Sequence, residues 1–96
     1  MKFHLGQKVK VSRQIYKRRD SQTRTKWVVS PLAFREPRVG TIVGHRTLKE
    51  GVTHYSHDDM PVFIADAYIS AYMIALSLRE KPVFALEENI EAVEAL

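Results

Sequence analysis

Cysteine is absent from this chain of 96 residues, so neither disulfide bonds nor thiolate metal sites can hold it together. A long apolar run is also missing. The longest one, at residues 71–78, is interrupted by Tyr72 and Ser77 and falls well short of the roughly 20 residues that a helix needs to cross a bilayer. The first twelve residues lack the apolar centre of a secretory signal. These absences predict a protein of the reducing cytoplasm that has no membrane segment.

Acidic side chains are scarce in the first half of the chain. Residues 1–49 contain thirteen Lys and Arg residues against two carboxylates, Asp20 and Glu36, whereas residues 50–96 contain two cations against nine carboxylates. The first half therefore carries a formal charge of +11 and the second half −7. One interpretation is an acidic partner for the first half, most commonly nucleic acid. The other is that the two halves neutralise each other within one small fold.

Signatures of catalysis are missing as well. No serine lies in a G-x-S-x-G sequence, and no cysteine is present to act as a nucleophile. The segment from His54 to Asp59 collects two imidazoles and two carboxylates, which are ligand types for zinc or manganese. On a strand, however, positions 54 and 57 project to opposite faces. We therefore expect a chain that is not an enzyme and that holds no metal and no cofactor, with a solvated loop at residues 54–59.

The length predicts a single domain over residues 1–96 with a thin core. Residues 5–11 alternate valine with lysine, which is the period of a half-buried strand. Residues 13–38 have a high charge density, and Ser30-Pro31 and Glu36-Pro37 break any regular element there. Only residues 26–29 have strand character. The pattern predicts a long, partly ordered basic loop at 13–38.

The second half of the sequence contains clear strand signals and two ambiguous segments. The β-branched residues 39–46 and 52–55 predict a hairpin around a turn at 48–51, followed by an irregular segment at 56–66. Residues 68–79 fit a helix and a central strand about equally well. The C-terminal residues 81–93 fit either short strands or a terminal helix with Leu86, Ile90 and Val93 on one face.

Three segments resemble small Src-homology-3-like barrels: residues 5–11, the glycine-flanked strand 40–44, and the ending at 82–91. In that family the chain ends with a strand, one tight helical turn and a short closing strand, and Glu87-Glu88-Asn89 would form the turn. Residues 44–48, 71–75 and 78–83 are similar to small proteins encoded by bacteriophages of actinobacteria. The likeness covers residues 38–93. It implies an all-β barrel of about five strands, with residues 68–79 as a strand, and the basic loop predicted above has no counterpart in it. It implies no activity.

Aromatic residues interleaved with cations in the first half indicate the candidate binding surface. Trp27 is either a core anchor or a ring on which nucleobases stack. The side chains that we expect to contact a partner are the basic and aromatic ones in and around the basic loop: Tyr16, Lys17, Arg18, Arg19, Arg24, Lys26, Trp27, Arg35, Arg38, Arg46 and Tyr55.

Two functions fit these observations. The first is a non-enzymatic, phage-encoded binding module that engages an acidic partner, either a host protein or nucleic acid, through the basic half of the chain. The second is a nucleic-acid-binding barrel that uses the basic loop and aromatic stacking. A structural phage component is a third possibility, but the sequence has neither a repeat nor a heptad pattern.

Overall fold

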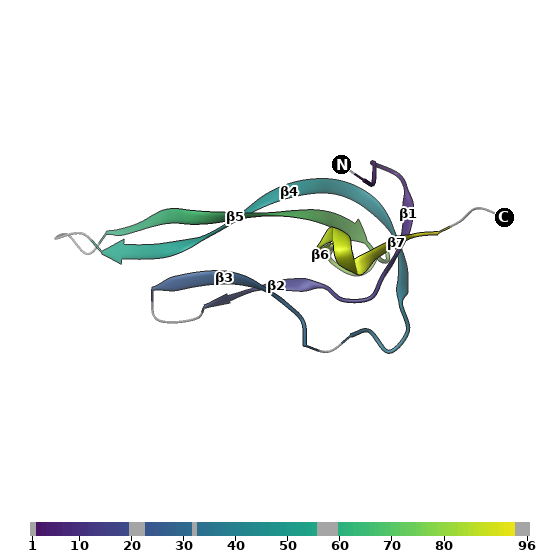
Figure 1. The fold of residues 1–96 in the computed structure, drawn as a ribbon, viewed down its shortest axis with the longest axis horizontal. Coiled ribbons are helices and arrows are strands. Elements are labelled where there is room, and N and C mark those ends of the chain that lie inside the picture. The colour runs from purple at the N-terminus through teal and green to yellow at the C-terminus, as the bar shows by residue number, and fades with distance from the viewer. Residues whose placement is uncertain (1, 20–22, 32, 56–59, 94–96) are drawn as a thin grey trace.

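The computed structural model describes residues 2–19, 23–31, 33–55 and 60–93. Almost all of its regular structure is β-strand, as the sequence predicts (Figure 1). No helix among the described residues is long and apolar enough to cross a membrane. The elements in chain order are β1 (Lys8–Val11), β2 (Ile15–Arg19), β3 (Arg24–Val29), β4 (Arg38–Tyr55), β5 (Pro61–Ala75), β6 (Val83–Ala85), the 3-10 helix η1 (Glu87–Asn89) and β7 (Ile90–Ala92).

Five strands close into an antiparallel barrel. β4 pairs with β5, β5 with β6, β6 with β2 and β2 with β3, and a short pairing of β3 with β4 completes the ring. β1 and β7 lie outside the ring, because β1 adds to the free side of β4 and β7 adds to β1. The prediction of a small all-β barrel with about five strands is therefore confirmed.

The core lies at one end of the barrel, where β1, the start of β4 and the end of β5 meet. Val9 and Val11 are completely buried, whereas Lys8 and Lys10 between them are exposed, as the alternating sequence predicts. Burial of each valine contributes about 1.5–3 kcal/mol. The remaining buried members of this cluster are Phe3, Ile42, Tyr72, Ile74, Ala85 and Ile90. The predicted strand at residues 5–11 is shorter in the structure, since Gly6 adopts a positive φ of 84° in a turn before β1.

The C-terminal segment forms the strand, tight turn and closing strand that the resemblance implied. η1 occupies Glu87–Asn89 between β6 and β7, and the Asn89 N–H donates to the carbonyl of Leu86 at 2.9 Å. The alternative of a terminal helix is therefore wrong. The ambiguous segment 68–79 is a strand as far as Ala75, because its residues pair with β4 on one side and, near the end, with β6 on the other.

Three sequence predictions are wrong in whole or in part. The basic segment 13–38 is not a long loop, since β2 and β3 form a regular hairpin within it, and the strand character predicted for residues 26–29 extends over all of β3. Cations occupy most positions of β2. The residues that face inward and those that face outward in the paired strand are therefore alike, and the sequence shows no strand period there. The predicted hairpin between 39–46 and 52–55 does not exist either: β4 runs unbroken through 48–51, and its partner is β5. Part of the expected irregular segment, residues 61–66, belongs to β5, and residues 56–59 lie outside the described residues.

Gly51 allows β4 to continue where a turn was expected. The register between β4 and β5 shifts here, with Glu50 opposite Ala67 and Gly51 opposite Ala65, so that Asp66 is an extra residue in a β-bulge. Gly51 is buried, and a Cβ on it would collide with the carbonyl oxygen of Ile64. Glycine is therefore required for close backbone approach and not for a turn.

The molecule is elongated, with principal extents of 61 × 25 × 25 Å. Figure 1 shows the reason: the distal halves of β4 and β5 project as a long two-stranded arm away from β1 and β7, and the β2–β3 hairpin lies alongside this arm. We call the paired residues 47–55 and 61–70 the β4–β5 arm. The β2–β3 hairpin and the β4–β5 arm face each other over much of the length of the molecule.

Substitution of Gly51 tests the close approach at the bulge. We expect Gly51→Ala to lower the free energy of unfolding by about 1–3 kcal/mol, because the new methyl group overlaps the backbone of β5. Gly44→Ala is the matched control, since a Cβ there meets only Met73 side-chain atoms at 3.6 Å and beyond. Urea denaturation followed by circular dichroism measures both, and equal stability of the two variants would contradict the assignment.

Candidate binding pocket between the two hairpins

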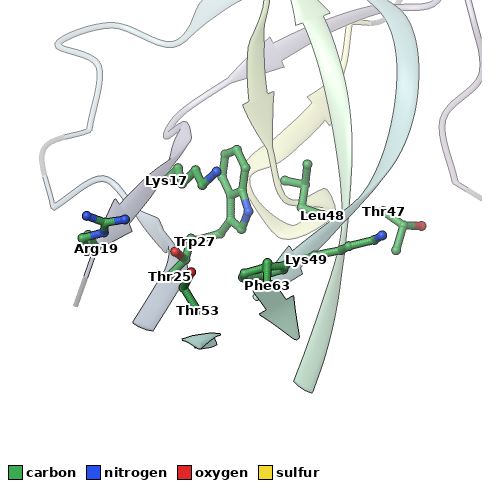
Figure 2. Close-up of a pocket in the computed structure, with 9 residues that line it drawn as sticks. All are labelled: Lys17, Arg19, Thr25, Trp27, Thr47, Leu48, Lys49, Thr53 and Phe63. Atoms are coloured by element: carbon green, nitrogen blue, oxygen red, sulfur yellow. The ribbon is translucent and has the colours of Figure 1, made fainter. Parts of the chain in front are cut away.

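A pocket of about 750 Å³ lies between the β2–β3 hairpin and the β4–β5 arm. Figure 2 shows Lys17 and Arg19 on one side of it, Thr47 and Lys49 on the other, and aromatic and aliphatic side chains between them. We call it the inter-hairpin pocket. Nine residues line it: Lys17, Arg19, Thr25, Trp27, Thr47, Leu48, Lys49, Thr53 and Phe63.

The register of the β2–β3 hairpin builds the basic wall of this pocket. Lys17 pairs with Trp27, and Arg19 pairs with Thr25. Because side chains alternate along a strand, these four residues share one face of the hairpin. Lys17 and Arg19 are two residues apart on β2, so their side chains leave the strand about 7 Å apart. The hairpin therefore directs two cations and one indole toward the arm.

Trp27 is both a packing residue and part of the pocket surface. Its ring packs edge to face against Phe84 of β6, with the centroids 5.6 Å apart and an interplanar angle of 76°. The residue is nevertheless only half-buried. Such an aromatic pair adds about 0.5–1.5 kcal/mol beyond the area that it buries. Packing against Phe84 thus fixes the ring as a wall of the pocket.

The facing wall comes from the β4–β5 arm. In Figure 2, Leu48 and Thr53 of β4 and Phe63 of β5 lie between Lys17 and Arg19 on one side and Lys49 on the other. Phe63 is 44% exposed, which is unusual for a phenylalanine in the body of a strand. Apolar surface is therefore available to a ligand beside the positive charges.

Three contacts join the two walls beyond the backbone pairing of β3 with β4. The backbone N–H of Trp27 donates a hydrogen bond of 2.9 Å to the Glu50 carboxylate, at a point where β3 and β4 have already separated. The Thr53 N–H donates to the carbonyl of Thr23 at 2.7 Å. On the surface, Arg24 forms an ion pair of 2.8 Å with the bulge residue Asp66. These contacts fix the width of the pocket on its β3–β4 side.

The lining of the pocket is positively charged. Three of its nine residues are cations, three are threonines, and none is acidic. Within the part of the chain that the structure describes, neither Lys17 nor Arg19 forms an ion pair with a carboxylate. Glu50 lies close by, but its carboxylate already accepts the Trp27 N–H. The pocket therefore offers hydrogen-bond donors and positive charge to an anionic ligand.

The structure brings only part of the predicted binding surface together. Of the eleven candidate residues, Lys17, Arg19 and Trp27 line the inter-hairpin pocket. Tyr16, Arg18 and Lys26 lie on the opposite face of the same hairpin, as the alternation of β2 and β3 requires. Tyr55 is exposed at the far end of β4, and Arg35 is exposed in the connection that precedes β4. Arg46 lines a separate, smaller cavity of about 310 Å³ beside Phe3 and Tyr72.

Two of the predicted cations bind carboxylates of the same chain. Arg24 pairs with Asp66, and Arg38 donates two hydrogen bonds to Glu80, of 2.7 and 3.2 Å. These hydrogen bonds are the main reason why the pKa of Glu80 is lowered and that of Arg38 is raised from their ordinary values. At these two positions the halves of the chain do neutralise each other. Neither arginine is part of the inter-hairpin pocket.

Six lining residues were not among the candidates: Thr25, Thr47, Leu48, Lys49, Thr53 and Phe63. Leu48 and Lys49 were assigned to a turn and Phe63 to an irregular segment, so the sequence pattern gave no reason to place them opposite Lys17. The apolar run Val62-Phe63-Ile64 was the available sequence signal, and the structure shows that all three residues are exposed, as large apolar residues at contact surfaces often are.

The described residues contain no group of three or more His, Asp or Glu side chains that could hold a metal ion. His57, Asp58 and Asp59 of the segment considered above lie outside the described residues. Comparison with protein-family models, with curated proteins and with solved structures found no match to this chain. The chemistry of the inter-hairpin pocket must therefore be inferred from its own residues.

The hydrogen bond from Trp27 to Glu50 can be tested by two substitutions. We expect Glu50→Ala to lower the free energy of unfolding by about 1–3 kcal/mol, because it leaves the half-buried Trp27 N–H without its acceptor. Glu50→Gln keeps a side-chain oxygen and should lose less than half as much. Trp27 is the only tryptophan, so its fluorescence during urea unfolding reports on this site directly. Equal stability of the alanine and glutamine variants would show that the hydrogen bond contributes nothing.

Proposed function

We propose that this chain is a non-enzymatic binding module that engages an acidic partner through the inter-hairpin pocket. The observation that carries the proposal is the pairing of Lys17 with Trp27 on a face that also carries Arg19, in a pocket whose nine lining residues include no acidic side chain. An anion entering this pocket gains charge-assisted hydrogen bonds and apolar contact together.

The lining residues support a binding function over a catalytic one. None of the nine is a histidine, carboxylate, cysteine, serine or tyrosine. General acid–base catalysis and nucleophilic catalysis draw mainly on these side chains, or on a lysine whose pKa is strongly lowered. We also propose that the chain is phage-encoded, and a partner protein of the host is then the first source of an acidic ligand.

Single-stranded nucleic acid is the second candidate. Trp27 and the exposed Phe63 are ring systems on which a base can stack, and Lys17 and Arg19 can contact phosphates. Lys17, Arg19 and Lys49 are the cations that line this pocket, so we expect two or three cations to contact phosphates. Log affinity should then fall against log salt with a slope of about −1.4 to −2.1 for single strands.

Titration of the chain with acidic ligands at two salt concentrations tests the proposal. The probes are a glutamate-rich peptide, a single-stranded oligonucleotide and its duplex, each followed by Trp27 fluorescence. We expect binding of at least one probe at low salt that weakens at higher salt, because screening reduces attraction between exposed charges.

A matched pair of variants assigns that binding to the pocket. Lys17→Ala with Arg19→Ala removes two cations spaced two residues apart on β2, and we expect at least about a tenfold loss of affinity, since charge-assisted hydrogen bonds are the strong ones. Lys8→Ala with Lys10→Ala removes the same charge at the same spacing from β1 and should change affinity less than twofold. Equal losses in the two double variants, or no binding of any probe at low salt, would refute the proposal.

A further inference from the structure

One edge of β5 has no strand partner among the described residues over most of its length. β5 pairs with β4 from Pro61 to Ala75, but on its other side β6 pairs only with Tyr72, Met73 and Ile74. Among the described residues, no strand pairs with that second edge before Tyr72. Backbone N–H and C=O groups along such an edge are a template for another extended chain.

The edge stays open because β6 is short. β6 ends at Ala85, and the chain then turns away into η1 and β7, which pairs with β1. The order of strands around the barrel places β6 between β5 and β2. β2 touches β6 at a single pair, Ile15 with Phe84, so that beyond this pair no described strand fills the interval between β2 and β5.

The interval lies on the open side of the inter-hairpin pocket. On the opposite side of the pocket, the pairing of β3 with β4 at Thr25 and Gly51 closes the barrel. At the end of the pocket nearest to β6, the ring of Trp27 packs against Phe84. A chain that continued from the end of β6 along β5 would therefore pass over the pocket that Lys17 and Arg19 line.

The unpaired edge has a regular stretch that suits a guest strand. The bulge residue Asp66 and Pro61, which has no N–H, interrupt the distal part, whereas residues 67–71 follow a regular register. Ala67, Ile69 and Ala71 are half-buried or buried, and Tyr68 and Ser70 between them are exposed. Two of the three inward residues are alanines, which leave room for side chains of a neighbouring strand.

The charge of the pocket specifies the side chains of that strand. Alternate residues of a guest strand point to one face at intervals of about 7 Å, which is also the interval between Lys17 and Arg19 on β2. With no acidic residue in the lining, the inward positions of the guest would carry carboxylates. Its outward positions would lie on the same face as Tyr68 and Ser70.

We propose that the inter-hairpin pocket binds an acidic peptide as an added β-strand, which pairs antiparallel with residues 67–71 of β5 in the register that β6 begins and directs carboxylates on alternate residues toward Lys17 and Arg19. This proposal rests on the proposed function, since it names the class of acidic partner. Backbone pairing favours a peptide over nucleic acid, because a sugar–phosphate chain has no N–H and C=O rows to match an open strand edge. The half-buried Trp27 ring, held by Phe84, also leaves less of its face for a stacked base.

Three blocked peptides of eight residues test the strand. The first alternates glutamate with threonine, the second contains the same residues with the glutamates grouped at one end, and the third is the first with alternate backbone amides N-methylated. Trp27 fluorescence measures each affinity at low salt. We expect the alternating peptide to bind at least about tenfold more tightly than the other two, because only it combines both edge hydrogen bonds and aligned carboxylates.

Amide hydrogen exchange locates the bound peptide on the protein. With the alternating peptide, amides within residues 67–71 of β5 that do not pair with β4 should gain protection of at least about tenfold. Amides of β1 serve as the internal control and should not change. Gain of protection along β2 alone would overturn the assignment to β5.

The outcomes separate this inference from the proposed function. Equal affinity of the N-methylated and unmodified peptides, with loss of binding in the Lys17→Ala and Arg19→Ala variant, would leave anion binding intact and overturn the added strand. Binding of an oligonucleotide but of none of the peptides would also leave anion binding intact and overturn the added strand. Failure of every acidic probe to bind would refute the proposed function as well.

Discussion

Closure of the barrel at two residue pairs, Arg24 with Val52 and Thr25 with Gly51, is the constraint on which the rest of the structure depends. Without it the β2–β3 hairpin would have only β6 as a neighbour strand, at a single pair. Gly51 permits β4 to approach β5 closely where β3 joins on its other side. Next to these pairs, the Glu50 carboxylate accepts a hydrogen bond from the backbone N–H of Trp27. Closure of the barrel therefore places the basic β2–β3 hairpin beside the apolar residues of the β4–β5 arm.

Alternation along β2 and β3 turns a dense cluster of cations into two different surfaces. Lys17 and Arg19 face the arm, whereas Arg18 and Lys26 share the outer face of the hairpin. Other basic residues pair with carboxylates of the same chain, since Arg24 at the start of β3 binds Asp66 and Arg38 at the start of β4 binds Glu80. Only a fraction of the strong positive charge of the first half is thus concentrated in the inter-hairpin pocket. The proposed acidic partner would complete the neutralisation that the chain begins on itself.

The sequence pattern predicted a strand where alternate side chains are buried. The alternation of Lys8, Val9, Lys10 and Val11 predicts β1 correctly because one face of this strand is fully buried. At the C-terminus the pattern fits strands and a helix alike, and the resemblance implied the strand, turn and closing strand that the structure has. β2 was missed because its polar residues fit a loop equally well, whereas most of β3 was recognised from the strand character of residues 26–29. The turn expected at residues 48–51 was wrong because Gly51 serves close packing against β5, which lies beyond the segment that the pattern could test.

The sequence by itself determined the half-buried strand of alternating valine and lysine near the N-terminus, the strongly basic character of the first half and the presence of a single tryptophan among those cations. These properties depend on composition and on side-chain period, which are local. Only the tertiary structure decided which cations share a face, that Trp27 packs on Phe84, and that Phe63 lies across a pocket from Lys17. Strand register and ring closure join residues far apart in the chain, such as Thr25 with Gly51, and no local pattern encodes the partner of a strand.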